Sequence, residues 1–292
     1  PEIQAKYRKQ FNYILVDEFQ DVNNLQVRLL KYLLTPNSQL FCVGDDWQSI
    51  YGFRGSEVDY IINFEKYFRS STIIKLELNY RSTQSIVDAS NEVIRHNKYK
   101  IIKELKALKK SPAKISVYRA KEEAEDGVDY TISKIKELLD VKSYANDDIL
   151  VLYRRSKMFA PYREKFRKAG LKIQGKTIHS AKGLERKAVF IIGLTEGYGG
   201  FPDVWEDDRI FRIIKQVKYD LLLEEERRLF YVALTRAKEE LFLITVIGNE
   251  SSFIREIPGE LYSQSETVFK PDFSPILSCP KCGRYLNDDF DY

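Results

Sequence analysis

Short apolar runs alternate with amphipathic stretches along most of the 292-residue chain. The apolar runs are rich in β-branched residues and nearly uninterrupted, which is typical of strands covered on both faces of a sheet. They lie at 13–18, 40–45, 73–78, 114–120, 148–153, 188–194 and 241–246. The stretches between them have helical spacing and lie at 23–34, 56–68, 82–96, 122–140, 157–169 and 222–237. This alternation predicts an α/β fold with mainly parallel sheets.

Polar side chains stand where several of these strands end. Asp17 and Glu18 close the run YILVDE, Asp45 closes LFCVGD, and Asn79 follows IIKLEL. Burying charge is costly, so the acids at 17 and 18 need a reason. Either the acids here serve a helix start, with Asp21 as the N-cap residue, or they face a metal ion and a substrate. Ligands of parallel α/β sheets bind at the carboxyl ends of strands, which favours the second interpretation.

Composition limits the function only weakly. The chain is 43% hydrophobic and 31% charged, as is usual for soluble proteins, and its net charge of +4 is too small to indicate a nucleic-acid partner. Ten Lys or Arg residues stand against one acid, Glu104, between residues 95 and 121. Such a run is either a solvated helix face or a groove for a polyanion. No apolar run reaches the ~20 residues of a membrane span, and three cysteines fit a reducing, cytoplasmic setting.

Five segments resemble, in family order, the signature motifs of superfamily 1 DNA helicases of the UvrD/Rep/PcrA class. They are LVDEFQD (15–21), VGDDWQSIYGFRGS (43–56), LELNYRS (76–82), TIHSAKGLERKAVFIIGL (177–194) and EEERRLFYVALTRAKEELFL (224–243). The resemblance implies ATP-driven movement along single-stranded DNA, usually 3′ to 5′, with one ATP held between two RecA-like domains. Residues 1–75 would then be the C-terminal half of the first RecA-like domain, residues 76–270 the second, and residues 271–292 a tail.

The resemblance also implies roles for nucleotide-facing side chains. Phosphoryl transfer to water needs neutralised charge and an oriented nucleophile. Asp17 suits Mg²⁺, and Glu18 is placed to orient or deprotonate the water. Gln48 matches the glutamine that senses the γ-phosphate. Arg81 and Arg236 match arginine fingers, because a planar charged fork gathers negative charge; the alternative is that both are interdomain salt-bridge partners.

Other residues match the family's adenine and nucleotide contacts. Tyr80 corresponds to the residue that stacks on adenine, with a core tyrosine as the alternative. Glu185 and Gly183 lie in the nucleotide-side motif AKGLE. Trp47 departs from the small or acidic residue expected at its position, and it either packs under the loop or adds a stacking surface.

Four residues match the family's DNA contacts or their neighbours: Tyr51, Phe53, Arg54 and His179. Stacking on Phe53 would contribute about 1–3 kcal/mol per base whatever the sequence of the strand, which suits a motor that accepts any strand. Arg54 resembles a residue that couples the DNA and ATP sites through an ion pair. His179 is alternatively a structural histidine.

Two features depart from the family pattern, and the tail adds a third observation. No GxxxxGK[ST] phosphate loop occurs in the sequence, so we expect a fragment that does not turn over ATP alone, or else a DNA- or partner-binding module that does not hydrolyse ATP. No large accessory subdomain fits ahead of TIHSAKGLE, as in helicase IV-type relatives. Cys279 and Cys282 form a CxxC pair, which is interpreted as half of a zinc ribbon, an incidental pair or a redox pair.

Overall fold

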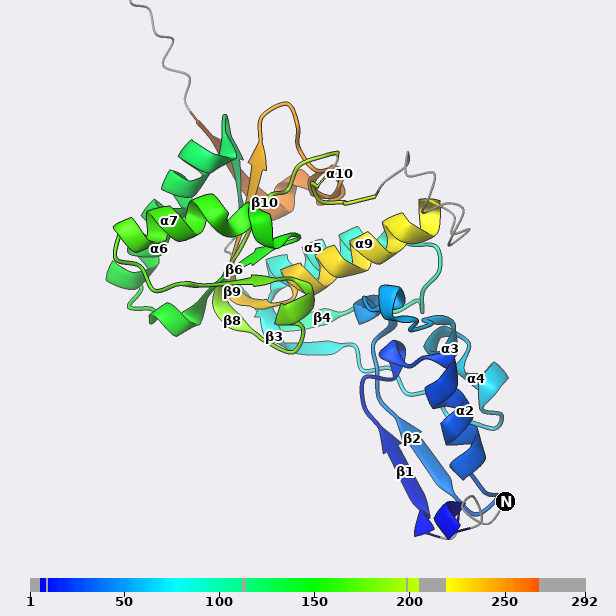
Figure 1. Cartoon of the computed structure of the whole chain (residues 1–292). Helices are drawn as coiled ribbons and strands as arrows, with labels where there is room; N and C mark the ends of the chain where they lie inside the picture. Colours follow the sequence, from blue (N-terminus) through cyan, green and yellow to red (C-terminus); the bar gives the residue numbers. More distant parts are fainter. Residues whose placement is uncertain (1–5, 9, 112–113, 198, 205–218, 268–292) are drawn as a thin grey trace, which may run out of the picture.

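The computed structural model describes residues 6–8, 10–111, 114–197, 199–204 and 219–267. This part of the chain forms a smaller N-terminal lobe, residues 10–68, and a larger C-terminal lobe, residues 78–267 (Figure 1). All pairs of named strands within it are parallel, which confirms the predicted α/β class with parallel sheets. No helix in these ranges is both long enough and apolar enough to cross a membrane.

The N-terminal lobe packs three helices against one face of a two-stranded sheet. Its strands are β1 (Tyr13–Val16) and β2 (Gln39–Cys42), and its helices are α2 (Asn24–Leu33), α3 (Asp59–Ile62) and α4 (Phe64–Tyr67). The core between them is small and consists of Phe19, Val22, Val27 and Tyr60. Asn23 caps α2 through a reciprocal bond with Gln26, so the interpretation of Asp21 as the N-cap residue is wrong.

The other face of this small sheet is open in the described part of the chain. Tyr13 and Leu15 of β1 are 72% and 73% exposed, and Phe41 of β2 is 61% exposed. The prediction that these two strands are covered on both faces is therefore wrong for the described residues. An apolar alternation and a continuous apolar run differ little over four residues, so the sequence could not separate the two cases.

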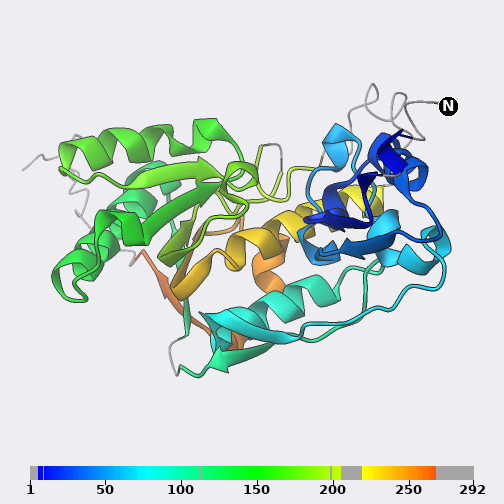
Figure 2. The ribbon, with the colours of Figure 1, turned by 90° about the horizontal axis from the view of Figure 1, so that it is seen from below.

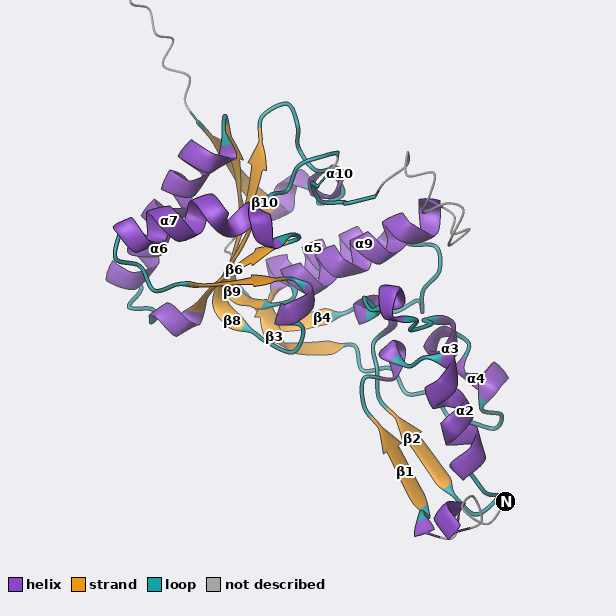
Figure 3. Cartoon of the chain, in the orientation of Figure 1, coloured by secondary structure: helices purple, strands orange, loops and turns teal. Residues whose placement is uncertain are grey.

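The C-terminal lobe is a three-layer sandwich around a six-stranded parallel sheet (Figure 3). The strand order is β10-β5-β9-β8-β6-β7. The strands are β5 (Ile115–Ala120), β6 (Ile149–Tyr153), β7 (Gln174–Thr177), β8 (Arg186–Ile191), β9 (Ala237–Val246) and β10 (Tyr262–Glu266). The helices are α5 (Gln84–Arg95), α6 (Val128–Asp140), α7 (Ala160–Lys168), α9 (Tyr219–Leu234) and α10 (Ser252–Arg255). A one-turn π-helix, Glu123–Gly127, precedes α6.

Alternate residues of each central strand enter different cores. Leu150 and Leu152 of β6 pack with α5 and α9, whereas Ile149 and Val151 pack with α6 and α7. All five residues of β6 are buried, as its continuous apolar run predicts. Five residues, 169–173, connect α7 to β7, so the chain has no accessory lobe at this point.

A parallel ribbon of two strands, β3 (Leu78–Thr83) and β4 (Lys106–Lys109), lies beside the main sheet. Strand β3 begins only at Leu78, so the predicted strand at 73–78 is wrong, although the carbonyl of Glu77 already accepts from the N–H of Lys106 at 2.7 Å. Asn79 consequently lies near the start of β3 and not at the carboxyl end of a strand. Propensity alone does not make a strand where no partner strand is available.

The basic run does not form a helix face. Helix α5 ends at Arg95, and the rest of the run continues through a loop, β4 and β5. Lys103 is largely buried, where its ammonium contacts Asp45 at 2.6 Å and Asp46 at 2.7 Å. The interpretation as a solvated helix face is wrong, whereas a polyanion groove along these residues stays a prediction.

Helix α9 and Trp47 are prominent in the contact between the lobes. Helix α9 runs from the main sheet across to the N-terminal lobe (Figures 1 and 2). Trp47 of the N-terminal lobe is 2% exposed and its ring meets that of Tyr231 on α9 edge to face, with centroids 5.5 Å apart. The indole N–H donates to the carbonyl of Ile101 at 3.2 Å. Trp47 therefore packs under its loop and offers no stacking surface.

Candidate functional site

The two acids of the first motif, Asp17 and Glu18, directly follow β1 in the sequence, and the backbone at Glu18 is strained. Asp17 and Glu18 are both exposed. Glu18 has φ 51° and ψ 42°, a left-handed conformation that is uncommon for a residue with a side chain. Its N–H donates to Oδ1 of Asp17 at 2.8 Å. This turn points both carboxylates out of the sheet, which answers why a strand should end on two charges.

A chain of hydrogen bonds connects Glu18 to the next motif. Gln20 is buried; its Nε2 donates to Oε2 of Glu18 at 2.5 Å, and its Oε1 accepts from the N–H of Asp45 at 3.0 Å. Nε2 of Gln48 in turn donates to Oδ2 of Asp45 at 2.8 Å. A Cβ at Gly44 would lie 2.6 Å from Oε1 of Gln20, so only glycine permits this approach.

Arg236 brings a cation from the C-terminal lobe to the end of that chain. It lies between α9 and β9 and is 2% exposed. Its Nη2 donates to Oε1 of Gln48 at 3.3 Å, while its Nε and Nη1 donate to the carbonyls of Val232 and Leu184. Burial, reinforced by the charge of Arg81, lowers the pKa of Arg236 to about 10. The guanidinium is still charged at neutral pH. We call Glu18, Gln20, Asp45, Gln48 and Arg236 the polar cluster.

The remaining residues expected to face a nucleotide lie beside Arg236. Arg81 of β3 forms an ion pair with Glu185, which Lys238 also contacts at 2.6 Å. The hydrogen bond from Lys238 is the main reason why the pKa of Glu185 is lowered. Glu185 belongs to the same lobe as Arg81, so the structure shows no interdomain salt bridge for Arg81 among the described residues. Tyr80 is 64% exposed, which excludes a core tyrosine.

Gly183 lies in the same segment as Glu185. Its backbone has φ 84°, and a Cβ added to it would meet no other atom within 4 Å. A residue with a side chain would therefore be strained by this backbone and not by crowding. Gly183 itself lies on the exposed surface.

The four residues expected to face DNA meet in one group, which we call the aromatic cluster: Tyr51, Phe53, Arg54 and His179. The rings of Phe53 and His179 are perpendicular with centroids 5.4 Å apart, and the hydroxyl of Tyr51 donates to the carbonyl of His179 at 3.1 Å. Arg54 lies over Tyr51 and Phe53, at 5.0 and 5.4 Å from their ring centroids. Among the described residues Arg54 has no ion pair, so the structure does not show the ion-pair coupling expected of it.

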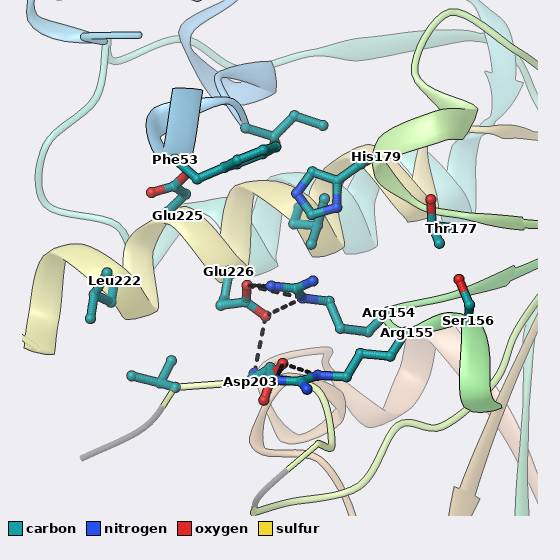
Figure 4. Close-up of a pocket in the computed structure, with 13 residues that line it drawn as sticks. Phe53, Arg154, Arg155, Ser156, Thr177, His179, Asp203, Leu222, Glu225 and Glu226 are labelled. Carbon is teal, nitrogen blue, oxygen red and sulfur yellow. Dashed lines mark hydrogen bonds and ion pairs between the residues drawn. The ribbon is translucent and has the colours of Figure 1, made fainter. Parts of the chain in front are cut away.

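A cavity of about 660 Å³ opens under the aromatic cluster (Figure 4). Sequence reasoning missed most of its lining. Arg154 holds Glu226 with a two-pronged bond, Nη2 to Oε1 at 2.8 Å and Nε to Oε2 at 3.0 Å, and Nε of Arg155 donates to Oδ2 of Asp203 at 2.5 Å. Burial, aided by the charges of Arg154 and Arg54, lowers the pKa of His179 to about 4, so its imidazole is neutral at physiological pH.

The residues that the C-terminal lobe contributes to the two clusters lie at opposite edges of the six-stranded sheet. Arg154 follows β6 and His179 follows β7, so the cavity lies at the carboxyl edge. Glu185 precedes β8 and Arg236 precedes β9, which places them at the amino edge. Asp17 and Asp45 of the N-terminal lobe thus lie past the carboxyl ends of strands, where ligands of such sheets bind, whereas Glu185 and Arg236 lie at the amino ends of strands.

The carboxylates at this site fit a magnesium ion that is bound together with a nucleotide, and not one that is held by protein side chains alone. Mg²⁺ binds through one or two carboxylates together with waters and substrate phosphates, and Asp17 offers one exposed carboxylate beside Glu18. Among the described residues no group of three or more His, Cys, Asp or Glu side chains could hold a metal ion by itself. Cys279 and Cys282 lie outside the described residues.

The lobes thus define an α/β protein with parallel sheets in which charged groups from two lobes meet. Family models match over most of the chain: the UvrD/REP helicase N-terminal domain over residues 1–69, and the UvrD-like helicase C-terminal domain over residues 74–176 and 163–247. The chain belongs to the UvrD-like helicase family, as its motifs predict.

Curated relatives agree with this assignment. The chain is 38% identical over 192 residues to the ATP-dependent DNA helicase PcrA of Leuconostoc citreum, covering 66% of this chain and 25% of that protein. It is 34% identical over 284 residues to a probable DNA helicase of Mycoplasma pneumoniae, covering 92% and 51%. It is 34% identical over 257 residues to DNA helicase IV of Escherichia coli, covering 86% and 36%. The chain spans a quarter to a half of the length of these relatives.

Proposed function

We propose that this chain carries the phosphate-sensing and water-orienting side of an ATP-driven DNA motor, together with a surface that holds single-stranded DNA. The observation that carries the proposal is the position of Gln48. Its amide nitrogen is bonded to Asp45 of its own lobe, and its oxygen accepts from Arg236 of the other lobe. A side chain that bridges two lobes in this way can report the state of a ligand between them.

The geometry supports a proposed role for each of these residues. Glu18 is exposed, strained and held by Gln20 at 2.5 Å, so it can orient or deprotonate a water in front of the turn. Arg236 and Arg81 supply charge from the C-terminal lobe, Tyr80 offers an open ring face, and Glu185 lies beside them. When bound with ATP at Asp17, Mg²⁺ would neutralise phosphate charge.

The DNA surface would be the aromatic cluster with the cavity below it. An exposed ring such as Phe53, at 56% exposure, can stack on any base. Arg54 over the rings adds a cation near the path of the strand. Single-stranded DNA is therefore the proposed substrate, with 3′ to 5′ movement taken from the family resemblance. We expect weak binding of oligo(dT) by the 292-residue chain, and binding that falls as salt rises.

A second candidate is a module that holds DNA or a partner without hydrolysis. The observation that favours it is the absence of a GxxxxGK[ST] pattern from the 292 residues. ATP turnover with and without oligo(dT), measured on the longest natural protein that contains this sequence, separates the candidates. The motor predicts DNA-stimulated turnover that is lost in Glu18→Gln and kept in Glu65→Gln, an exposed control on α4. Binding of oligo(dT) without turnover in the wild type would favour the module.

Zinc binding by Cys279 and Cys282, in the cytoplasmic setting that the cysteine content indicates, is also a proposal. A structural zinc site needs four ligands, and this pair supplies two. Metal analysis of the longest natural protein, with Cys279→Ser and Cys282→Ser as variants, would show one bound zinc that both substitutions remove.

A further inference from the structure

One segment of the C-terminal lobe connects the two edges of the main sheet. It leaves β7 at Thr177, which lies level with Tyr153 at the carboxyl edge, and enters β8 at Arg186, which pairs with Ala237 at the amino edge. His179 near its start belongs to the aromatic cluster, and Glu185 at its end pairs with Arg81. Residue 182 is midway between them.

Lys182 turns from this segment toward the N-terminal lobe. Its side chain is 9% exposed, and its ammonium donates to Oδ2 of Asp21 at 2.5 Å and to the carbonyl of Gln48 at 3.1 Å. Oε2 of Glu18 lies 3.2 Å away. Burial raises the pKa of Asp21 and the charge of Lys182 opposes that rise. The three N–H donors of the ammonium thus face three oxygen atoms.

The same ammonium also contacts the aromatic cluster. It lies 5.3 Å from the ring centroid of Tyr51, within the range of a cation–π contact. Tyr51 in turn holds the carbonyl of His179, and its ring lies 6.0 Å from that of Phe53. Lys182 is therefore shared between the carboxylate proposed to orient water and the rings proposed to receive DNA.

We propose that Lys182 is a positioning residue that couples occupation of the aromatic cluster to the orientation of Glu18. The proposal rests on the proposed function. A base that stacks on Phe53 or Tyr51 changes the surroundings of the Tyr51 ring and so the preferred position of the ammonium. The contact with Glu18 is the longest of its three contacts with oxygen, and a small shift of the ammonium alters it first. DNA binding thereby changes how Glu18 is held, which is the differential contact that coupling requires.

The matched control is Lys187. Its ammonium also pairs with an aspartate, Asp148 at 3.0 Å, and also lies near a tyrosine ring, Tyr144 at 5.2 Å, but neither partner belongs to the polar or the aromatic cluster. ATP turnover is measured with and without saturating oligo(dT) on the longest natural protein that contains this sequence. We expect Lys182→Met to reduce the ratio of the two rates by about tenfold or more. Lys187→Met should leave the ratio unchanged.

Oligo(dT) affinity separates coupling from simple DNA contact. We expect Lys182→Met to keep the wild-type Kd within about threefold, and Lys182→Arg to restore most of the ratio because it keeps the charge. An unchanged ratio in Lys182→Met, or a ratio lost only because oligo(dT) no longer binds, would overturn the proposal. If the wild-type protein shows no DNA-stimulated ATP turnover, the proposed motor function is wrong. That result is obtained before any variant is compared.

A second variant tests the same route if Lys182→Met fails to fold. Tyr51→Leu removes the ring and leaves the lysine in place. At saturating oligo(dT), Tyr51→Leu should lower the ratio of ATP turnover with DNA to turnover without it. We also expect a double variant that combines Tyr51→Leu with a folded substitution of Lys182, Lys182→Met or Lys182→Ala, to lose no more than the lysine variant alone. Both substitutions would interrupt the same coupling between the aromatic cluster and Glu18. Losses that multiply in the double variant, or a normal ratio in Tyr51→Leu, would show that the ring and the lysine act separately and would contradict the coupling.

Discussion

The polar cluster and the aromatic cluster are built by opposite means. In the polar cluster, Gln20 and Arg236 are buried, each polar group holds the next, and the backbone at Glu18 is strained. In the aromatic cluster, the rings keep open faces over a cavity, and Phe53 is 56% exposed. Fixed dipoles suit a reaction that develops charge, whereas open ring faces suit a strand that must bind and leave. Single substitutions should therefore lower turnover in the first cluster and DNA affinity in the second.

The largest expected effect comes from Arg236→Ala. Removal of an arginine that gathers transition-state charge lowers kcat by about 10³-fold or more, and here it also leaves the oxygen of Gln48 without its partner from the other lobe. The measurement is DNA-stimulated ATP turnover of the longest natural protein that contains this sequence. The control is Arg255→Ala, whose side chain is 68% exposed on α10. A decrease below about tenfold in a folded Arg236→Ala variant would remove Arg236 from the catalytic role.

A smaller effect is expected for Gln48→Ala. The amide makes one bond to Asp45 and accepts one from Arg236. A hydrogen bond to a charged group contributes about 1.5–3 kcal/mol, so turnover should fall about 10- to 150-fold while oligo(dT) binding stays near that of the wild type. Loss of DNA binding together with turnover would mean that the two clusters are not separate.

In the aromatic cluster, Phe53→Ala should weaken oligo(dT) binding without unfolding the chain. Loss of one stacking partner costs about 1–3 kcal/mol, which is about 5- to 150-fold in Kd. Phe41→Ala is a matched control, since Phe41 is 61% exposed but lies on β2. Fluorescence titration of the 292-residue chain with labelled oligo(dT) measures both. Equal weakening by the two variants would show that Phe53 has no special part in binding.

The sequence predicts the members of the aromatic cluster and most of the polar cluster, but it predicts neither Gln20 nor how the side chains are held. Motif residues such as Gln48 and Phe53 can be found because their types and spacing are specific. Lys182 lies inside the motif that begins TIHSAKGLE, yet its partners come from the other lobe, and no spacing rule reveals such a contact. Arg154 and Glu226 are separated by 72 residues, so nothing local in the sequence indicates their two-pronged bond.

Errors in the fold have a similar cause. Asn79 is predicted at the end of a strand because IIKLEL has high strand propensity. Pairing depends on a partner, and the register of β3 with β4 begins at Leu78, with one earlier bond from Lys106 to the carbonyl of Glu77. The open face of β1 and β2 is equally hidden in the sequence because neighbours, and not the run itself, decide what covers a strand.

The smallest expected effect is the pH dependence contributed by His179. Burial and two nearby arginines lower the pKa of His179 in the folded chain to about 4, from the ordinary value of 6.5. Above pH 6.5 both the folded and the unfolded chain hold a neutral imidazole, so His179 adds no pH dependence there. As the pH falls from 6.5 toward 4, only the unfolded chain takes up this proton, and the free energy of unfolding decreases.

Urea unfolding of the wild type and of His179→Asn, compared at about pH 7 and about pH 5, measures this contribution. The wild type should lose more stability than His179→Asn over that interval. His96→Asn, at the exposed second histidine of the chain, is the control and should follow the wild type. Parallel losses in the wild type and His179→Asn would show that His179 takes up its proton equally in the folded state. The imidazole beside Phe53 would then be a cation at mildly acidic pH, and the aromatic cluster would hold DNA partly by charge, which would remove its contrast with the polar cluster.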